Sequence, residues 1–282
     1  MSIESLLEKV KALRGPQGCS WDKAQTHQSL RKYLLEESYE VLELLDKIDS
    51  NESLQNDPAL KESLQDELGD LLFQILLHAE LASETTDISF ASIAKNLEKK
   101  IVRRHPHVFT EQKSLSKEEI STQWEKTKNQ EKKKNSVLEG IPLHLPALQR
   151  ADKVISRVTK VGFQWPNLEG PLDKAAEELA ELAEEIKKFD HLQKNGANEK
   201  ELTAQKTKME AELGDMIFSL CNIAHFFHIE PENSLRTMLQ RFEKRFGYVE
   251  RALKKEGKEL TKVSLKEMDH HWNLAKEEER KK

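Results

Sequence analysis

The sequence predicts an all-α fold, arranged as a tandem repeat of two helical bundles. No stretch of its 282 residues combines sustained apolar–polar alternation with β-branched side chains, so strands are not expected. Apolar residues recur instead at helical spacing. Features of the first half also return in the same order in the second half, at an offset of about 141 to 148 residues, which indicates two homologous halves.

The four tryptophans make the repeat visible. Trp21 corresponds to Trp165, and each stands three residues after a glycine. Trp124 corresponds to Trp272, and each is followed four residues later by a lysine. An ordered recurrence of this kind is typical of an internal duplication, in which each copy forms one structural unit.

The segment 135–146 contains one glycine and two prolines, and it is predicted to be a linker between a first domain at 1–134 and a second at 147–282. About five helices are expected in each domain. The expected helices of the first domain are 3–14, 28–48, 59–84, 89–103 and 117–133. Those of the second domain are 146–160, 171–189, 198–228, 232–256 and 264–280.

The long helices are each justified by a stripe of apolar residues, beginning with an amphipathic segment at the N-terminus. The later stripes are Leu34, Val41, Leu45 and Ile48 in 28–48, Leu64, Leu68, Leu71, Leu72 and Ile75 in 59–84, and Leu182, Ala183 and Ile186 in 171–189. Pro106 ends the basic helix of the first half, because proline cannot continue a helix. The corresponding helix of the second half is expected to continue to about residue 256.

Carboxylates three residues apart border these stripes, and such residues share one face of a helix. The first half carries Glu37, Glu40, Glu67 and Asp70, and the second half carries Glu178, Glu181, Glu212 and Asp215. Two such helices packed together would direct four carboxylates to one point, where they repel each other unless a cation neutralises them. Oxygen ligands suit Mg²⁺, with Mn²⁺ as a substitute. The partner that most needs such cations is a polyphosphate.

Gly69 and Gly214 occupy the same position inside two strongly helical segments. A glycine within a helix costs about 1 kcal/mol relative to alanine. Its occurrence at the same place in both halves predicts a close approach of the partner helix there, which would draw the four carboxylates together.

Basic and aromatic side chains supply the other side of a polyphosphate site. The helix 232–256 contains Arg241 and Arg245, and its first-half counterpart also ends in basic residues. Trp272 and Lys276 stand one helical turn apart, where an indole can stack on a base and an ammonium group can hold a phosphate. Trp165 is a further candidate for substrate binding. The longer basic helix makes the second half the main catalytic candidate.

Composition excludes several other classes. The net charge of −5 gives no general attraction to a nucleic acid polymer or to anionic lipid. No apolar run approaches the length of a transmembrane helix. The two cysteines, Cys19 and Cys221, suggest reduced thiols, and a cytoplasmic protein is expected. The sequence contains neither a Gly-x-x-x-x-Gly-Lys phosphate loop nor a Gly-x-Gly-x-x-Gly motif.

The repeated acidic motifs resemble the Glu-Glu-x-x-Glu … Glu-x-x-Asp signature of the MazG family of nucleoside triphosphate pyrophosphohydrolases. The resemblance covers essentially the whole chain, including residues 18–22 and 103–109. It implies a Mg²⁺-dependent, homodimeric all-α enzyme that cleaves nucleoside triphosphates to monophosphate and pyrophosphate with broad base tolerance. Carried over, the catalytic and metal-binding residues would be Glu178, Glu181, Glu212 and Asp215, with Glu37, Glu40, Glu67 and Asp70 as first-half equivalents. Arg241 stands where the family often has lysine.

Two alternatives remain open on the sequence alone. One is a pyrophosphohydrolase for a specialised nucleotide, such as phosphoribosyl-ATP or guanosine tetraphosphate, on the same scaffold. The other is a non-enzymatic helical adaptor whose acidic faces are merely solvated. The favoured mechanism is attack on the α-phosphorus by a metal-activated water.

Overall fold

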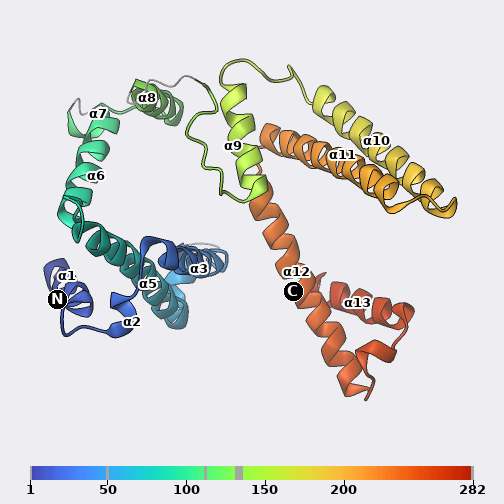
Figure 1. Cartoon of the computed structure of the whole chain (residues 1–282), viewed down its shortest axis with the longest axis horizontal. Coiled ribbons are helices and arrows are strands. Elements are labelled where there is room, and N and C mark those ends of the chain that lie inside the picture. The colour runs from blue at the N-terminus through green and yellow to red at the C-terminus, as the bar shows by residue number, and fades with distance from the viewer. Residues whose placement is uncertain (1, 49–50, 111–112, 131–135, 281–282) are drawn as a thin grey trace. The chain divides into compact units, whose positions relative to one another are not determined.

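The computed structural model describes residues 2–48, 51–110, 113–130 and 136–280, and every regular element within those ranges is a helix (Figure 1). The all-α prediction is therefore confirmed. Contacts between residues divide the chain into two compact units, Met1–Lys133 and Lys134–Lys282. The predicted boundary between residues 134 and 135 lies outside the described residues, so the exact domain limits stay a prediction.

The described residues of the first unit form five longer helices that closely match the predicted ones, and three short ones. The elements of this unit are α1 (Ile3–Arg14), α2 (Ser20–Lys23), α3 (His27–Leu45), α4 (Asn51–Asn56), α5 (Pro58–Ser83), α6 (Phe90–Arg104), α7 (Pro106–Phe109) and α8 (Lys117–Gln130). The predicted end of the last helix, at residue 133, lies outside the described residues. The sequence does not predict α2, α4 and α7, which are four to six residues long. Hydrophobic periodicity needs a longer window than these segments offer.

Local caps fix where the two central helices of the first unit begin. Thr26 and Ser29 form a reciprocal capping box at the start of α3. Asp57 accepts a hydrogen bond from the backbone N–H of Leu60, and Pro58 occupies the first position of α5. Each cap satisfies backbone donors that a helix start leaves free, which contributes about 1 kcal/mol.

The core of the first unit lies where α3 and α1 pack against α5. Its fully buried side chains are Val10, Leu30, Leu76 and Leu77. Burying an aliphatic side chain of this size stabilises the fold by about 1.5–3 kcal/mol. This packing holds α3 and α5 side by side, and therefore sets the distance between the carboxylates that they carry.

The second unit contains the five predicted helices and one short 3₁₀ turn. Its elements are α9 (Ala147–Thr159), α10 (Glu169–Lys194), α11 (Glu199–Phe226), α12 (Pro231–Lys255), η1 (Leu260–Lys262) and α13 (Leu265–Arg280). The turn between α10 and α11 uses Gly196, whose φ of +72° favours glycine. Asn198 and Glu201 then form a capping box that starts α11.

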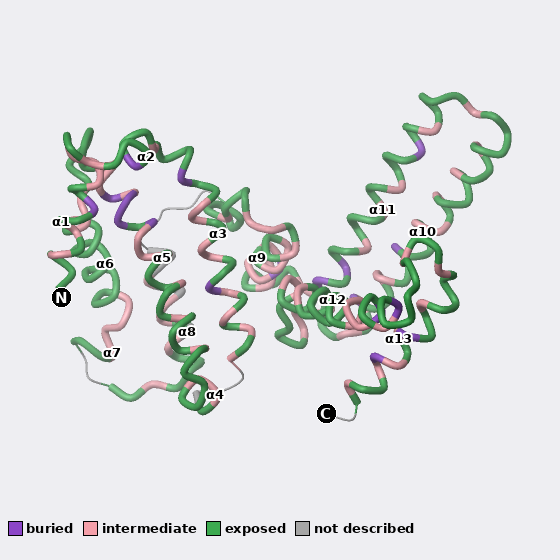
Figure 2. Tube along the Cα trace, turned by 90° about the horizontal axis from the view of Figure 1, so that it is seen from below, coloured by how far each residue is buried: buried purple, intermediate pink, exposed green. Residues whose placement is uncertain are grey.

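Two helix pairs make up the second unit, and both contact α9. One pair is α10 with α11, and the other is α12 with α13. Val249 and Leu253 of α12 and Ala275 of α13 are buried, whereas most of the surface of the α10–α11 pair is exposed (Figure 2). Among the described residues, no helix is long and apolar enough to cross a membrane.

The expected reason for Gly69 and Gly214 is wrong within the single chain. A Cβ atom added to either residue would meet no heavy atom within 4 Å outside its own helix turn. Both glycines therefore face open space, and none of the described helices of the same chain approaches them closely. Periodicity placed them inside helices but could not reveal which side of each helix is covered.

Candidate functional site

Three carboxylates of the second unit come together between α10 and α11. Glu178 from α10 and Glu212 and Asp215 from α11 each offer an oxygen atom, and these atoms lie within 4.8 Å of one another. The hairpin packing of α10 on α11 brings the two motifs to the same level. The fourth predicted ligand, Glu181, is exposed. Its charge is nevertheless close to Glu212: burial is the largest cause of the raised pKa of Glu212, and the charge of Glu181 is the second.

The first unit repeats this arrangement between α3 and α5. Glu37, Glu67 and Asp70 offer oxygen atoms within 4.8 Å of one another, and the predicted Glu40 is exposed. Burial, a hydrogen bond with Glu40 and the charges of the neighbouring carboxylates raise the pKa of Glu37 to about 7. In each half, three carboxyl groups therefore lie close enough for their charges to repel one another.

Lys174 distinguishes the two clusters, and the sequence reasoning missed it. Its Nζ lies 2.7 Å from an oxygen of Glu178, whose side chain is only 6% exposed, and 2.9 Å from Glu177. The hydrogen bond to Glu178, and to a smaller extent that to Glu177, raises the pKa of Lys174. Tyr33 takes the corresponding place four residues before Glu37. A lysine four residues before the first ligand, present in the second half only, is the feature of the sequence that could have revealed this difference.

The donor set of each cluster fits a hard divalent cation. All its members are carboxylate oxygens, which Mg²⁺ and Mn²⁺ accept and softer metals do not require. Burial, and then the like charges of neighbouring carboxylates, raise the pKa of Glu212 and of Glu67, so the ionised clusters are under repulsion that a cation would relieve. Glu178, Glu212 and Asp215 are the residues that would hold it in the second unit.

The raised pKa of Glu37 makes the stability of the first unit depend on pH. Between the pKa of the unfolded state, near 4.5, and about 7, the folded state binds more protons, so stability falls as pH rises. The full shift corresponds to about 3 kcal/mol, which solvent screening reduces to about 1 kcal/mol. In EDTA, denaturant unfolding is expected to show this loss between pH 5 and pH 8, and Mg²⁺ is expected to reverse it.

Glu37→Gln is the variant that should flatten this pH dependence, with the exposed neighbour Glu36→Gln as the matched control. Equal stability of the unmodified chain at pH 5 and pH 8 in EDTA would contradict the assignment. So would the same flattening in Glu36→Gln.

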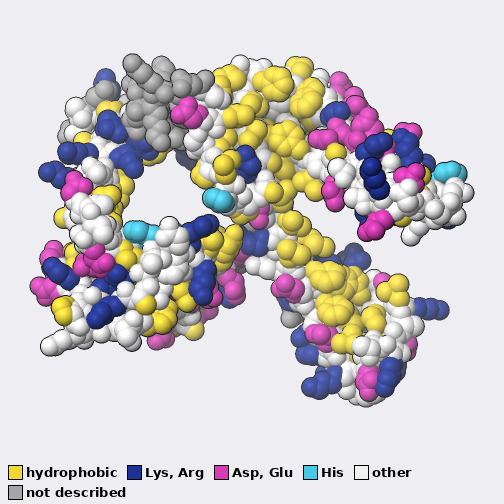
Figure 3. Space-filling model, viewed as in Figure 1, with side chains coloured by type: hydrophobic (Ala, Val, Ile, Leu, Met, Phe, Trp, Pro, Cys, Tyr) yellow, Lys and Arg dark blue, Asp and Glu magenta, His cyan; other side chains and the backbone are white. Residues whose placement is uncertain are grey.

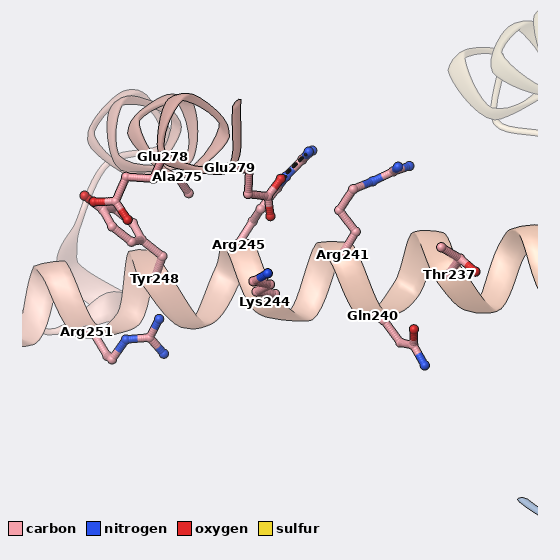
Figure 4. A pocket seen from close by; sticks show the side chains of 10 residues that line it. All are labelled: Thr237, Gln240, Arg241, Lys244, Arg245, Tyr248, Arg251, Ala275, Glu278 and Glu279. Atoms are coloured by element: carbon pink, nitrogen blue, oxygen red, sulfur yellow. Dashed lines mark hydrogen bonds and ion pairs between the residues drawn. The ribbon is translucent and has the colours of Figure 1, made fainter. Parts of the chain in front are cut away.

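Four of the five predicted substrate-binding side chains lie on the other helix pair, α12 with α13. The guanidinium of Arg245 donates to Glu279 at 2.7 and 2.9 Å, and its Cζ lies 5.7 Å from the ring centre of Trp272. Trp272 also packs on Phe242, at 5.0 Å between ring centres. Arg241 is exposed and lines a cleft along α12 (Figure 4). Arg245 is therefore already partnered, and would exchange that partner to bind phosphate.

The same cation–aromatic contact occurs in the first unit. Arg104 lies 5.0 Å from the ring centre of Trp124, at the positions that correspond to Arg245 and Trp272. The half-buried Lys276 stands one turn after Trp272 on α13. Each half therefore carries an acidic cluster on one helix pair and an arginine–tryptophan contact on another.

Trp165 lies between α9 and α10 rather than beside the other predicted substrate residues. A Cβ atom added to Gly170 would lie 2.0 Å from the ring of Trp165, so the indole covers the first turn of α10 at a place where only glycine fits. The ring is partly exposed. This position gives Trp165 a packing role at the start of the helix that carries Glu178.

The carboxylates and the cations of the second unit belong to different helix pairs. Among the described helices, no extended packing joins α10 or α11 to α12 or α13. A single chain therefore forms both the carboxylate group and the basic and aromatic group of the predicted site, but it does not bring these two groups together. This separation is the main difference between the structure and the site expected from sequence.

Comparisons with known proteins match both halves of the chain. The model of the MazG nucleotide pyrophosphohydrolase domain matches residues 25–109 and 169–249. The chain is 36% identical to the nucleoside triphosphate pyrophosphohydrolase/pyrophosphatase MazG of Thermotoga maritima, over 97% of this chain and 95% of that protein. It is 35% identical to the nucleoside triphosphate pyrophosphohydrolase of Escherichia coli K12, over 98% of both. It is 38% identical to the uncharacterized protein YabN of Bacillus subtilis, over 96% of this chain and 51% of YabN.

Proposed function

Since this chain belongs to the MazG family of nucleotide pyrophosphohydrolases, we propose that it hydrolyses nucleoside triphosphates to nucleoside monophosphate and pyrophosphate, mainly in its second half. The observation that carries the proposal is the convergence of Glu178, Glu212 and Asp215 within 4.8 Å. A broad tolerance of bases and a cytoplasmic location go with this proposal.

Mg²⁺ is the proposed cofactor, held by Glu178, Glu212 and Asp215 with Glu181 at the edge of the cluster. When bound, such a cation polarises phosphate oxygens and lowers the pKa of a coordinated water. The first-half carboxylates, Glu37 and its neighbours, form an equivalent set that lacks the lysine.

The chain's own side chains divide the remaining work. A carboxylate of the cluster accepts the proton of the attacking water. The water oxygen bonds to the α-phosphorus, and pyrophosphate leaves with the electron pair of the broken bond. Arg241, Arg245 and Lys276 offset the charge that grows on the leaving group. Trp272 offers a surface on which a base can stack.

Lys174 has a proposed role in the same site. It neutralises the buried carboxylate of Glu178 before a cation binds, as the 2.7 Å contact indicates. A cation at the cluster would release its ammonium group, which is then available to a phosphate oxygen. This release would keep the site from holding an unpaired buried charge at either stage.

A homodimer is proposed because the α10–α11 pair has an uncovered apolar face. Exposed aliphatic side chains recur there every three to seven residues on both helices. They are Leu172, Leu179 and Ile186 of α10 and Leu213, Ile217 and Leu220 of α11. The open space at Gly214 lies on the same helix. Figure 3 shows further hydrophobic side chains exposed over α9 and α12. Contiguous exposed apolar surface of this kind is typical of an interface.

The second copy is also proposed to complete the site. Within one chain the carboxylates and the arginine–tryptophan group occupy separate helix pairs. A partner that covers the α10–α11 face is placed to bring its own α12 and α13 toward the carboxylates. Each site of the dimer would then combine Glu178 from one chain with Arg241 from the other.

Product analysis tests the reaction. We expect a panel of ribo- and deoxyribonucleoside triphosphates with Mg²⁺ to yield monophosphate and pyrophosphate in equal amounts, and EDTA to abolish the turnover. Diphosphate with phosphate would contradict the proposed bond. Cleavage restricted to phosphoribosyl-ATP or guanosine tetraphosphate would establish the specialised alternative, and absence of turnover on every substrate would favour the adaptor.

A further inference from the structure

A groove runs along α12 where it faces α13. Two clefts of about 530 and 360 Å³ form it, and they adjoin each other because Tyr248, Arg251 and Glu278 line both. Figure 4 shows the residues that line the larger cleft. Part of the first cleft belongs to the proposed substrate site, through Arg241 and Arg245. The other lining cations, Lys244, Arg251 and Lys255, have no part in the proposed reaction. We call the whole feature the α12 groove.

Cations follow one face of α12 along this groove. Arg241, Lys244, Arg251 and Lys255 are all exposed, and at 1.5 Å per residue they span about 21 Å. Together with Arg245, five cations line the groove against three carboxylates. The groove is therefore positively charged, although the chain as a whole carries a net charge of −5.

Two of the three carboxylates are already neutralised. Glu279 pairs with Arg245 at 2.7 Å, and Glu256 pairs with Lys258 at 2.9 Å and lies 3.2 Å from His271. The hydrogen bond from Arg245, and then the charges of Arg245, Lys244 and Arg241, lower the pKa of Glu279. The positive field of the row therefore extends across the groove to α13.

Gly247 gives Arg251 its place in the row. A Cβ atom at residue 247 would lie 3.2 Å from Nη1 of Arg251, so the guanidinium folds back over the glycine, toward the turn that carries Lys244. Figure 4 shows this side chain lying along the helix. A glycine in a helix interior is unfavourable relative to alanine. Here it leaves room for a cation against the helix surface.

A buried histidine of α13, His271, contributes to the wall of the α12 groove. The residue is 8% exposed and lines the smaller cleft. Its Nε2 faces Glu256, while its Nδ1 is buried without a hydrogen-bond partner among the described residues. The imidazole therefore stands against Glu256, one of the three carboxylates that line the groove.

We propose that the α12 groove binds inorganic polyphosphate, a linear chain of phosphates that enters at Arg241 and extends toward Lys255. Such a chain carries charge on every unit and matches a straight row of cations. Tyr248 is the only phenyl-type ring among the described lining residues, whereas single-stranded nucleic acids bind to several aromatic rings. The inference rests on the proposed function in one respect: a chain bound at Arg241 and Arg245 would compete with a triphosphate.

Direct binding in EDTA tests the groove without any turnover. Calorimetry with the full chain is expected to show that long-chain polyphosphate binds at least about tenfold more tightly than tripolyphosphate, because more cations are engaged. The double variant Arg251→Gln/Lys255→Gln should lose this difference. Lys254→Gln/Lys266→Gln removes the same charge outside the groove and should keep it. Equal affinity for both chain lengths, or equal loss in both variants, would overturn the proposal. So would tighter binding of single-stranded DNA than of polyphosphate of similar charge.

Inhibition separates this inference from the proposed function. Long-chain polyphosphate should compete with the nucleotide in the unmodified chain. Arg251→Gln/Lys255→Gln should keep kcat/KM within about twofold and need about tenfold more polyphosphate for the same inhibition. Chain-length-dependent binding without nucleotide cleavage would refute the proposed function and leave the groove intact. Nucleotide cleavage without chain-length-dependent binding would refute the groove alone.

Discussion

Glu178→Gln is expected to lower kcat/KM for nucleoside triphosphates by about a thousandfold, the range seen when one group that acts in the transition state is removed. Glu178 is the most buried member of its cluster and the one that Lys174 neutralises. Glutamine keeps the size of the side chain but removes the charge that a cation requires. Steady-state kinetics with pyrophosphate detection gives the measurement.

Two control variants make this loss specific. Glu177→Gln removes the same charge from the neighbouring residue, which also contacts Lys174 at 2.9 Å but is exposed, and should stay within about twofold of the unmodified chain. Glu37→Gln should also retain most of the activity. The melting temperature of Glu178→Gln in EDTA should change little, because the lost contact with Lys174 offsets the relieved repulsion with Glu212 and Asp215. Full activity in Glu178→Gln, or an equal loss in Glu177→Gln, would refute the assignment.

Mixing two inactive variants is expected to restore activity if each site combines two chains. Glu178→Gln inactivates the carboxylate part of the site. Arg241→Gln removes a cation from the other part and should lower the activity by about a hundredfold. In a mixed dimer, one site carries both changes and the other carries neither. After subunit exchange, about a quarter of all sites would be intact, so about a quarter of the unmodified activity should return.

The control for this experiment is a mixture of Glu178→Gln with Asp215→Asn. Both changes lie on the α10–α11 pair of the same chain, so every site in the mixed dimer carries one of them and no activity should return. Subunit exchange is followed with two fluorescent labels. Verified exchange without recovery in the Glu178→Gln and Arg241→Gln mixture would show that each site is built from a single chain, and would refute the shared site.

Short-range interactions explain why so much of the fold follows from sequence. Apolar stripes and caps such as Thr26 and Asn198 act within a few residues, so the long helices begin and end close to where their patterns predict. The spacing of Glu212 and Asp215 is likewise local, since residues three apart on a helix share a face. Two helices that pack through their apolar stripes then place their edge carboxylates near one another.

The sequence by itself thus determined the helical class, the duplication and three carboxylates of each acidic cluster, whereas the predicted fourth ones, Glu40 and Glu181, lie exposed outside these groups. Only the tertiary structure decided that Lys174 pairs with Glu178, that Arg245 is held by Glu279, and that Gly214 faces open space. It also decided that the carboxylates and the cations lie on separate helix pairs. The physical reason is range: periodicity fixes which residues share a helix face, whereas the partner of that face depends on packing between segments distant in the chain.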